Sequence, residues 1–255
     1  MMLGITELTY TALIAFLIVI IIGPIFIPML RKFKFGQTVR DDGPQTHLAK
    51  NGTPTMGGII MIVAILITGL TRVKVSHDMA VGLICIAGFG FIGFLDDFIK
   101  IKLKRSLGLK AYQKIILQVA LSFYVAFYQY TSSSSASQLM IPFTDFVINV
   151  GILYIPIMMF IIVAIVNAVN LTDGLDGLAS GVTLIVSVFF MLFASSIAGN
   201  TEVAVLAAAT VGACLGFLGF NSYPARVFMG DTGSMALGGA VVAFSVLTNS
   251  VLIIP

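Results

Sequence analysis

The sequence predicts an all-α, polytopic integral membrane protein, and three observations support this fold class. Of its 255 residues, 58% are hydrophobic and only 10% are charged. The mean hydropathy is +1.07, which is too high for a soluble domain. The apolar residues form long uninterrupted runs, and a run of about 20 apolar residues can cross a bilayer as a helix.

Eight apolar runs are candidate membrane spans. The first is followed by Arg31 and Lys32 and lacks a small-residue cleavage site, so we interpret it as a retained helix rather than a removed signal peptide. The second and third runs are short and are expected to be extended or tilted. In chain order, the runs cover residues 10–30, 57–70, 80–95, 111–130, 147–167, 178–198, 203–220 and 234–254.

The connector at 131–146 contains a serine run and a proline, which predicts an exposed loop with little regular structure. Cys85 and Cys214 fall inside separate runs and show no metal-ligand spacing. We therefore interpret both cysteines as small core residues.

Basic residues are distributed unevenly between the two sides of the predicted bundle. If the loop after the first run is cytoplasmic, the loops at 31–56, 96–110, 168–177 and 221–233 also lie inside. Together with the nearby Lys114, they hold 12 of the 14 lysine and arginine residues. The positive-inside rule therefore predicts this orientation. The net charge of +3 reflects the same bias and does not indicate nucleic-acid binding.

Five aspartates lie at the ends of apolar runs, and all five fall on the predicted cytoplasmic side. A carboxylate at the centre of a bilayer costs about 3 kcal/mol on insertion scales, so carboxylates at the helix ends of a membrane protein indicate a functional site. We therefore expect an acidic, metal-ready site where lipid meets water. These residues are Asp96, Asp97, Asp173, Asp176 and Asp231.

Asp96 and Asp97 end the third run. Neighbouring side chains on a helix point about 100° apart, so a regular helix cannot easily direct both at one ion. We expect different roles: one carboxylate binds a metal or a proton, and the other is held by a basic neighbour such as Lys100, one turn further on. A solvated helix end is the alternative interpretation of this pair.

Residues 170–177 form a tight loop with two glycines between the fifth and sixth runs. Glycines permit close approach of a ligand, and Asn170, Asp173 and Asp176 are polar side chains that such a loop can present. Capping of the following helix by Asp173 or Asp176 is the alternative interpretation.

The segment from Asn221 to Ser234 leads into the last run and contains Phe228 and Asp231 among small polar residues. The N-terminus of a helix offers free N–H groups and a positive dipole end, which favour a phosphate. Asp231 beside it suits Mg²⁺, a hard ion that prefers carboxylate, water and phosphate oxygens.

Two other segments offer groups for a phosphorylated ligand. The loop at 43–58 contains hydroxyls, among them Thr55, together with Lys50 and paired glycines that open a helix. After the aspartate pair, Lys100 and Lys114 lie nearest to helix ends and are candidates for ligand contact. Attraction to anionic lipid is the simpler interpretation of the other lysines in that segment.

Four motifs give the chain a resemblance to a known family. They are GPQTHLAKNGTPTMGG (43–58), FIGFLDDFIK (91–100), NAVNLTDGLDGLASG (167–181) and FNSYPARVFMGDTGSMALGG (220–239). In these motifs the chain resembles the phospho-N-acetylmuramoyl-pentapeptide-transferases, which belong to the polyprenyl-phosphate N-acetylhexosamine-1-phosphate transferase superfamily. The motifs follow the family order and run from the first predicted cytoplasmic loop almost to the end of the chain.

The resemblance implies an enzyme of peptidoglycan synthesis. Its reaction would transfer phospho-N-acetylmuramoyl-pentapeptide from UDP-MurNAc-pentapeptide to undecaprenyl phosphate, giving lipid I and UMP, with Mg²⁺ as the cofactor. It also implies a multi-pass protein of the bacterial cytoplasmic membrane whose active site faces the cytoplasm. Membrane lipid is an expected partner, nucleic acid is not, and a homodimer is compatible with the resemblance.

By motif, Asp96 and Asp97 match the catalytic pair of the family, and Asp231 matches its catalytic magnesium ligand. The family pattern continues with two further spans and a loop that carries three histidines. Residues 1–255 are therefore expected to form a single transmembrane transferase domain without that part. The nucleotide and active-site positions of the family match Lys50, Lys114, Asn170, Asp173, Asp176, Asn221 and Phe228.

Two other functions are compatible with these patterns. The enzyme alternative is a related transferase that uses another UDP-N-acetylhexosamine with the same lipid. The non-enzyme alternative is an ion-coupled transporter. Transporter carboxylates typically lie near the middle of the membrane at broken helices, whereas the aspartates here are expected at one interface.

Overall fold

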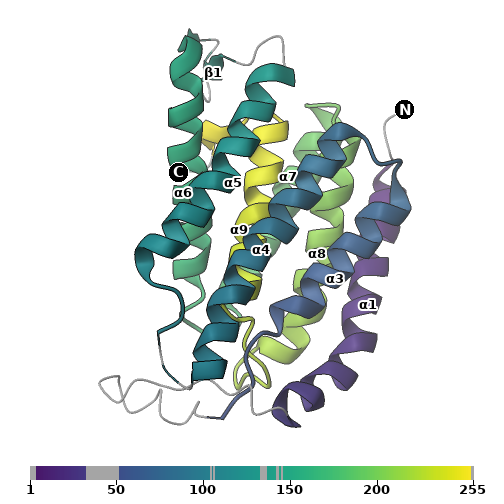
Figure 1. Ribbon diagram of the computed structural model, residues 1–255. Helices are drawn as coiled ribbons and strands as arrows, with labels where there is room; N and C mark the ends of the chain where they lie inside the picture. Colours follow the sequence, from purple (N-terminus) through teal and green to yellow (C-terminus); the bar gives the residue numbers. More distant parts are fainter. Residues whose placement is uncertain are drawn as a thin grey trace.

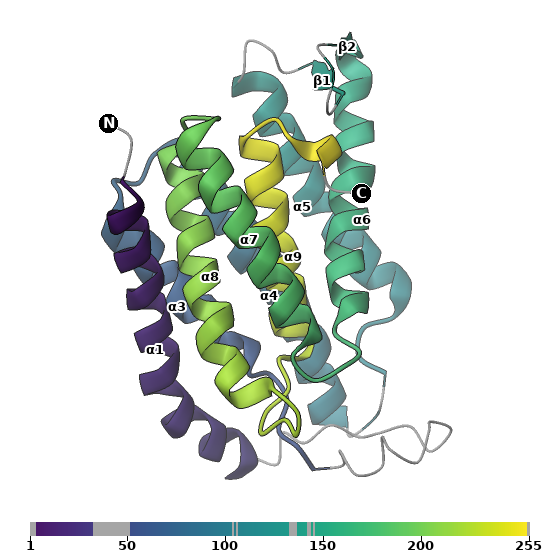
Figure 2. The ribbon, with the colours of Figure 1, turned by 180° about the vertical axis from the view of Figure 1, so that it is seen from behind.

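The computed structural model contains a bundle of long helices, seen from opposite sides in Figures 1 and 2. It describes residues 4–32, 52–103, 105, 107–132, 137–141, 144 and 146–253. Within these ranges eight α-helices correspond one to one with the eight predicted runs. They are α1 (Ile5–Lys32), α3 (Gly58–Arg72), α4 (His77–Leu103), α5 (Ala111–Ser132), α6 (Tyr154–Thr172), α7 (Leu178–Ser196), α8 (Thr201–Asn221) and α9 (Gly230–Leu247).

The all-α membrane class predicted from composition is confirmed. Six of the described helical segments are long and apolar enough to cross a membrane, namely α1, α4, residues Gly151–Thr172, α7, α8 and α9. Helix α3 is apolar but has only 15 residues, and α5 is not among the six although it has 22 residues. Eight spans therefore remain a prediction.

The connector between α5 and α6 has more regular structure than predicted. Strands β1 (Gln138–Met140) and β2 (Val147–Asn149) pair in antiparallel fashion, and the short 3-10 helix η1 (Gly151–Leu153) follows. The predicted span at 147–167 therefore begins too early. Pro156 lies in the first turn of α6, where its missing N–H removes no intrahelical hydrogen bond.

Three helix ends near the predicted site also differ from the sequence-based bounds. Helix α4 continues to Leu103, so Asp96 and Asp97 lie within the helix and not at its end. Helix α6 continues to Thr172, which places Asn170 on a helix. Helix α9 begins at Gly230, four residues before the predicted start at Ser234, and a second 3-10 helix, η2 (Val251–Ile253), follows it.

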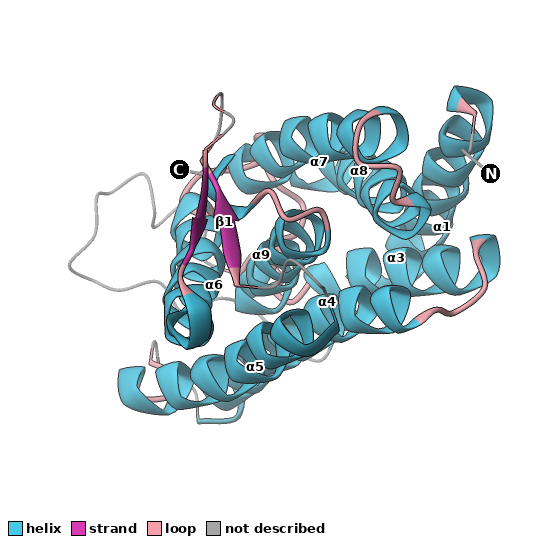
Figure 3. Cartoon of the chain, turned by 90° about the horizontal axis from the view of Figure 1, so that it is seen from above, coloured by secondary structure: helices cyan, strands magenta, loops and turns pink. Residues whose placement is uncertain are grey.

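Helices α8 and α9 form the centre of the bundle. In the end-on view, α9 is surrounded by other helices, whereas α1 and α5 lie at the periphery (Figure 3). In the most apolar stretch of 18 residues of each helix, 89% of the residues are buried in α9 and 78% in α8, compared with 28% in α1. A centrally buried helix whose first turn carries Asp231 is a rigid support for a functional site.

Small residues allow the helices to approach closely, as expected where lipid supplies no hydrophobic force between them. A Cβ atom on Gly212 of α8 would collide with the carbonyl oxygen of Ala12 in α1. A Cβ atom on Gly239 of α9 would collide with the carbonyl oxygen of Cys85 in α4. The buried cysteines, Cys85 and Cys214, are core residues as predicted.

Candidate active site

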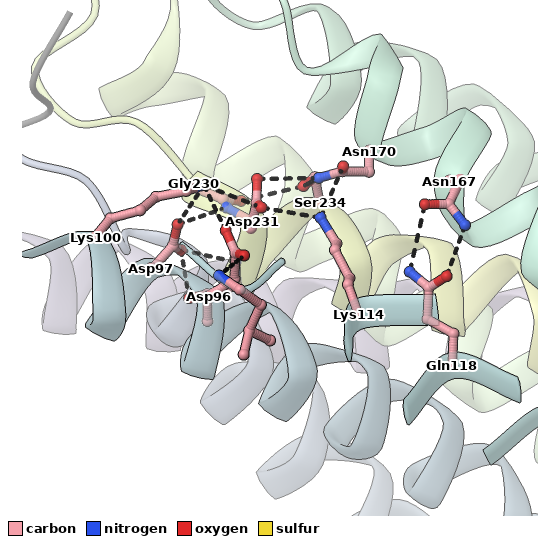
Figure 4. Close-up of polar contacts among 12 residues, drawn as sticks. Asp96, Asp97, Lys100, Lys114, Gln118, Asn167, Asn170, Gly230, Asp231 and Ser234 are labelled. Carbon is pink, nitrogen blue, oxygen red and sulfur yellow. Dashed lines mark hydrogen bonds and ion pairs between the residues drawn. The ribbon is translucent and has the colours of Figure 1, made fainter. Parts of the chain in front are cut away.

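Three carboxylates meet at one end of the bundle, where the last part of α4 lies beside the first turn of α9. Asp96, Asp97 and Asp231 each offer an oxygen atom, and these atoms all lie within 4.8 Å of one another. Figure 4 shows the three side chains with the lysines and amides around them. Asp96 and Asp97 are neighbours on α4, and contrary to the expectation from helix geometry each brings one oxygen into this cluster, which Asp231 joins from α9.

A glycine on α4 makes this meeting geometrically feasible. A Cβ atom on Gly93 would collide with the carbonyl oxygen of Asp231 and would lie 2.7 Å from the backbone nitrogen of Thr232. Gly93 precedes Asp96 and Asp97 by three and four residues, so all three lie on neighbouring parts of the same helical face. The absence of a side chain at this position therefore lets the aspartate pair reach the start of α9.

Asp97 binds the start of α9. Its carboxylate accepts hydrogen bonds from the backbone N–H of Asp231 at 3.2 Å, the backbone N–H of Thr232 at 2.9 Å and the Thr232 hydroxyl at 2.7 Å. Two of the N–H groups predicted to bind a phosphate are therefore already bonded to a carboxylate. The phosphate-binding prediction for this helix N-terminus is not supported, and the anion found there belongs to the protein itself.

Asp96 has different contacts from its neighbour, as the sequence predicted. Its Oδ1 accepts a hydrogen bond of 2.8 Å from the backbone N–H of Leu109, in the connector between α4 and α5. Its Oδ2 lies 2.6 Å from Nζ of Lys100, one helical turn further along α4. The predicted pairing of one aspartate with Lys100 is thus confirmed.

Asp231 is the most exposed of the three carboxylates. The relative exposure of its side chain is 23%, compared with 5% for Asp96 and 4% for Asp97. Its Oδ2 lies 3.1 Å from Nζ of Lys100 and 3.0 Å from Nζ of Lys114. By formal count, three ionised carboxylates and two ammonium groups carry one net negative charge, and an additional cation would balance it.

Asn170 joins Asp231 to the end of α6. Its side-chain nitrogen donates to Oδ1 of Asp231 at 3.2 Å and to the Ser234 hydroxyl at 2.7 Å. Its side-chain oxygen accepts from Nζ of Lys114 at 3.3 Å. The predicted candidates Asn170, Lys114 and Asp231 therefore form one hydrogen-bonded group that draws residues from α6, α5 and α9.

Thr55 and Phe228 lie beside this group on two paired segments. The backbone N–H of Phe228 donates to the carbonyl of Pro54 at 2.8 Å, and that of Gly57 donates to the carbonyl of Phe228 at 2.9 Å. A Cβ atom on Gly230, whose φ is +71°, would lie 2.8 Å from the Thr55 hydroxyl and 2.5 Å from Oδ2 of Asp97. Lys50, the other candidate from this loop, lies outside the described residues.

Asn221 and Asp176 hold two loops together. The side-chain oxygen of Asn221 accepts from the N–H of Gly177 at 3.0 Å, and its nitrogen donates to the carbonyl of Val227 at 2.9 Å. Oδ2 of Asp176 accepts from the N–H of Ala225 at 3.1 Å. Asn221 is only 2% exposed, so its position in the structure is that of a buried brace.

The capping alternative for the loop after α6 is wrong in its simple form. The N-cap of α7 is Gly177, with φ +78°, and not an aspartate. Asp173 follows the last residue of α6 as its C-cap, and its N–H donates to the carbonyl of Asn170 at 3.3 Å. Asp173 and Asp176 are both partly exposed.

Sequence reasoning missed one buried polar residue near the site. Gln118 on α5 is fully buried and exchanges hydrogen bonds with Asn167 on α6. The only signal in the sequence was an amide within an apolar run, and polar residues inside a membrane segment are expected to have a partner.

The chain is a polytopic membrane protein with an acidic, metal-ready site, because its apolar helical bundle ends in this cluster of charged and amide side chains. Comparison with known proteins identifies the family within this class. Residues 79–249 match the model of glycosyl transferase family 4, and residues 50–62 match the phospho-N-acetylmuramoyl-pentapeptide-transferase signature 1.

Curated relatives are similar over nearly the whole chain. The phospho-N-acetylmuramoyl-pentapeptide-transferase of Alkaliphilus metalliredigens is 52% identical over 98% of this chain and 78% of its own length. The proteins of the same name from Desulfitobacterium hafniense and Clostridium kluyveri are each 49% identical, over 95% and 97% of this chain and 76% and 78% of their own lengths. The chain belongs to the phospho-N-acetylmuramoyl-pentapeptide-transferase family.

Proposed function

We propose that this chain catalyses the transfer of phospho-N-acetylmuramoyl-pentapeptide from its UDP-linked form to undecaprenyl phosphate, which yields lipid I and UMP. Membership of the family supports this reaction. The structural observation that carries the proposal is the contact of Asp231 with Lys100 and Lys114 at the end of an apolar bundle. Such a site supplies positive charge for phosphates at the end of an apolar helical bundle.

The residues at this site fit Mg²⁺. Three carboxylates present oxygen atoms within 4.8 Å of one another, and Mg²⁺ prefers oxygen ligands. Asp231 would be the principal ligand because its side chain is the most exposed of the three, and Asp96 lies next to it. When bound, Mg²⁺ would neutralise negative charge on the pyrophosphate of the UDP-sugar.

The lysines would bind and orient the phosphates. Nζ of Lys114 and Nζ of Lys100 lie 3.0 Å and 3.1 Å from the same oxygen of Asp231, so both ammonium groups face one point. Phosphoryl transfer depends mainly on positioning and on neutralisation of charge. Two ammonium groups that converge beside a partly exposed carboxylate supply both contributions.

We propose direct attack of the lipid phosphate on the β-phosphorus of the UDP-sugar, with UMP as the leaving group. A phosphate monoester has a second pKa near 6, so most of it is dianionic at pH 7 and needs no strong base. Asp96 would orient the attacking phosphate or accept a residual proton. A covalent aspartyl intermediate is the alternative route.

The contacts of the aspartate pair favour direct attack. The Asp97 carboxylate accepts three hydrogen bonds and its side chain is 4% exposed, while the Asp96 carboxylate is held by Lys100 and by the N–H of Leu109. Neither is free to act as a nucleophile without breaking these contacts. Incubation with labelled UDP-sugar in the absence of lipid should therefore leave no labelled phosphosugar on either aspartate, and a trapped adduct would establish the covalent route.

An assay of UMP release tests the reaction itself. The purified protein in lipid nanodiscs should release UMP from UDP-MurNAc-pentapeptide only when undecaprenyl phosphate and Mg²⁺ are present. Faster turnover of UDP-N-acetylglucosamine would instead identify the related sugar-phosphate transferase. Ion flux through proteoliposomes without UMP release would identify a transporter.

A further inference from the structure

Helix α5 has a narrow buried face although it carries a residue of the candidate site. Its buried residues are Gln118, Ser122, Val125, Ala126 and Gln129, and most of its other side chains are exposed. Since lipid supplies little hydrophobic force between helices, hydrogen bonds and close packing must hold such a helix in place. The polar contacts of this face therefore matter more than they would in a water-soluble bundle.

A reciprocal amide pair joins α5 to α6. Nε2 of Gln118 donates to Oδ1 of Asn167 at 3.4 Å, and Nδ2 of Asn167 donates to Oε1 of Gln118 at 2.8 Å. Nδ2 of Asn167 also donates to the carbonyl of Val163 at 2.7 Å, which orients this amide on its own helix. In Figure 4 the pair lies next to Lys114 and Asn170, which separate it from the three carboxylates.

The same two helices supply Lys114 and Asn170 to the cluster. Lys114 precedes Gln118 by four residues on α5, and Asn170 follows Asn167 by three residues on α6, so each site residue lies on the same helix face as one member of the pair. Lys114 contacts both Asn170 and Asp231. A slide of α5 by one residue, about 1.5 Å along its axis, would be enough to break a hydrogen bond.

We propose that Gln118 is a positioning residue for the transfer reaction: through its bond to Asn167 it holds α5 against α6 at the level where Lys114 contacts Asp231. The described hydrogen bonds of Gln118 go to Asn167, and neither goes to a carboxylate of the cluster. The effect of Gln118 on turnover rests on the proposed function, whereas its effect on the position of Lys114 does not.

The other end of α5 supplies a matched control. Gln129 lies eleven residues after Gln118 on the same buried face, and its Nε2 donates to Oδ1 of Asn249 at 2.7 Å. Both glutamines are thus buried amides bonded to an asparagine of a different segment. Only Gln118 lies next to the site, so Gln118→Leu and Gln129→Leu separate a positioning effect from a general loss of stability.

Lysine labelling measures the position of Lys114 without requiring turnover. The protein in nanodiscs is treated with an amine-reactive reagent, and labelling of Lys114 is compared by mass spectrometry with that of the exposed Lys110. Gln118→Leu should raise the relative labelling of Lys114, and Gln129→Leu should leave it unchanged. If Gln118→Leu fails to fold, the exchange Gln118→Asn with Asn167→Gln should preserve the bond and keep Lys114 protected. Unchanged labelling in Gln118→Leu, or loss of protection in the exchanged protein, would overturn the inference.

Steady-state kinetics supply the second measurement. Gln118→Leu should lower kcat by about tenfold or more, since small displacements of charged groups have large effects on a transfer reaction. In a Lys114→Met background the same substitution should have no further effect, because Gln118 acts through Lys114. If the two substitutions instead lower kcat independently, so that their fold-changes multiply, the positioning role of Gln118 is overturned. Absence of turnover in the unaltered protein would refute the proposed function while the labelling result stands independently.

Discussion

The Asp97 carboxylate of α4 accepts a hydrogen bond of 2.9 Å from the backbone N–H of Thr232 in α9. The same carboxylate accepts from the N–H of Asp231, so it lies at the positive end of the central helix. The backbone of Asp231 is thereby held by Asp97, while its side chain contacts the two lysines, Asn170 and Asp96. An aspartate whose motif suggests catalysis thus positions another aspartate.

Replacement of Asp97 should destabilise the protein as well as inactivate it. Asp97→Ala removes the acceptor for two backbone N–H groups and one hydroxyl, and we expect a loss of about 1–3 kcal/mol of stability. Thermal unfolding in detergent measures this loss. Asp78→Ala is the matched control, because Asp78 accepts a hydrogen bond from Tyr128 near the start of α4. Equal stability of Asp97→Ala and the unaltered protein would contradict the capping role.

Gly93→Ala should separate α4 from α9. A Cβ atom at this position would collide with the backbone of Asp231, and overpacking of this kind costs about 1–3 kcal/mol. We expect lower thermal stability and loss of UMP release.

Gly88→Ala on the same helix is the control for helix propensity and volume. Its Cβ would approach Cδ2 of Leu121 at 2.7 Å, and that end of a flexible side chain can move. If Gly93→Ala and Gly88→Ala behave alike, close approach at Gly93 is not required for the site.

Asp231→Asn should abolish the response to Mg²⁺. The substitution keeps the size of the side chain but removes the charge of the most exposed carboxylate of the cluster. Stabilisation against heating on addition of Mg²⁺ should disappear, because only binding to the folded state stabilises it. Glu202→Gln, in the first turn of α8, should keep the response. Normal turnover of Asp231→Asn with an unchanged magnesium requirement would contradict the metal assignment.

Cysteine labelling in intact cells should establish the orientation of the bundle. Cys85 and Cys214 are fully buried, so they contribute little background. A membrane-impermeant maleimide should label Lys74→Cys from outside, whereas Lys102→Cys should react only after permeabilisation, as the distribution of basic residues predicts. The reverse pattern would place the carboxylates on the outer face.

Hydropathy predicted the helices well because it depends only on neighbouring residues. The predicted run at 111–130 corresponds to α5 (Ala111–Ser132), and the run at 203–220 corresponds to α8 (Thr201–Asn221). Hydropathy gave the wrong helix end where polar residues continue a helix. Helix α4 extends past the aspartate pair to Leu103, since the carboxylates find partners on α9 and on Lys100.

The candidate site was predictable in its members but not in their contacts. Motif and charge selected Asp96, Asp97, Lys100, Lys114, Asn170 and Asp231, and the structure joins all six by hydrogen bonds or ion pairs. Asn221 was selected for the same reasons, yet it braces two loops. A side chain that binds a ligand and one that binds a backbone can have the same residue type and the same position in a motif.

The sequence by itself determined the membrane class, the apolar helices of the described part of the chain and the kinds of charged group at one end of them, because hydropathy and side-chain chemistry belong to each residue and its neighbours. Only the tertiary structure decided that Asp97 binds the start of α9 and that Asp231 faces two lysines. These contacts depend on how closely α4 and α9 approach. That distance is set by Gly93 against a backbone more than one hundred residues away in the chain.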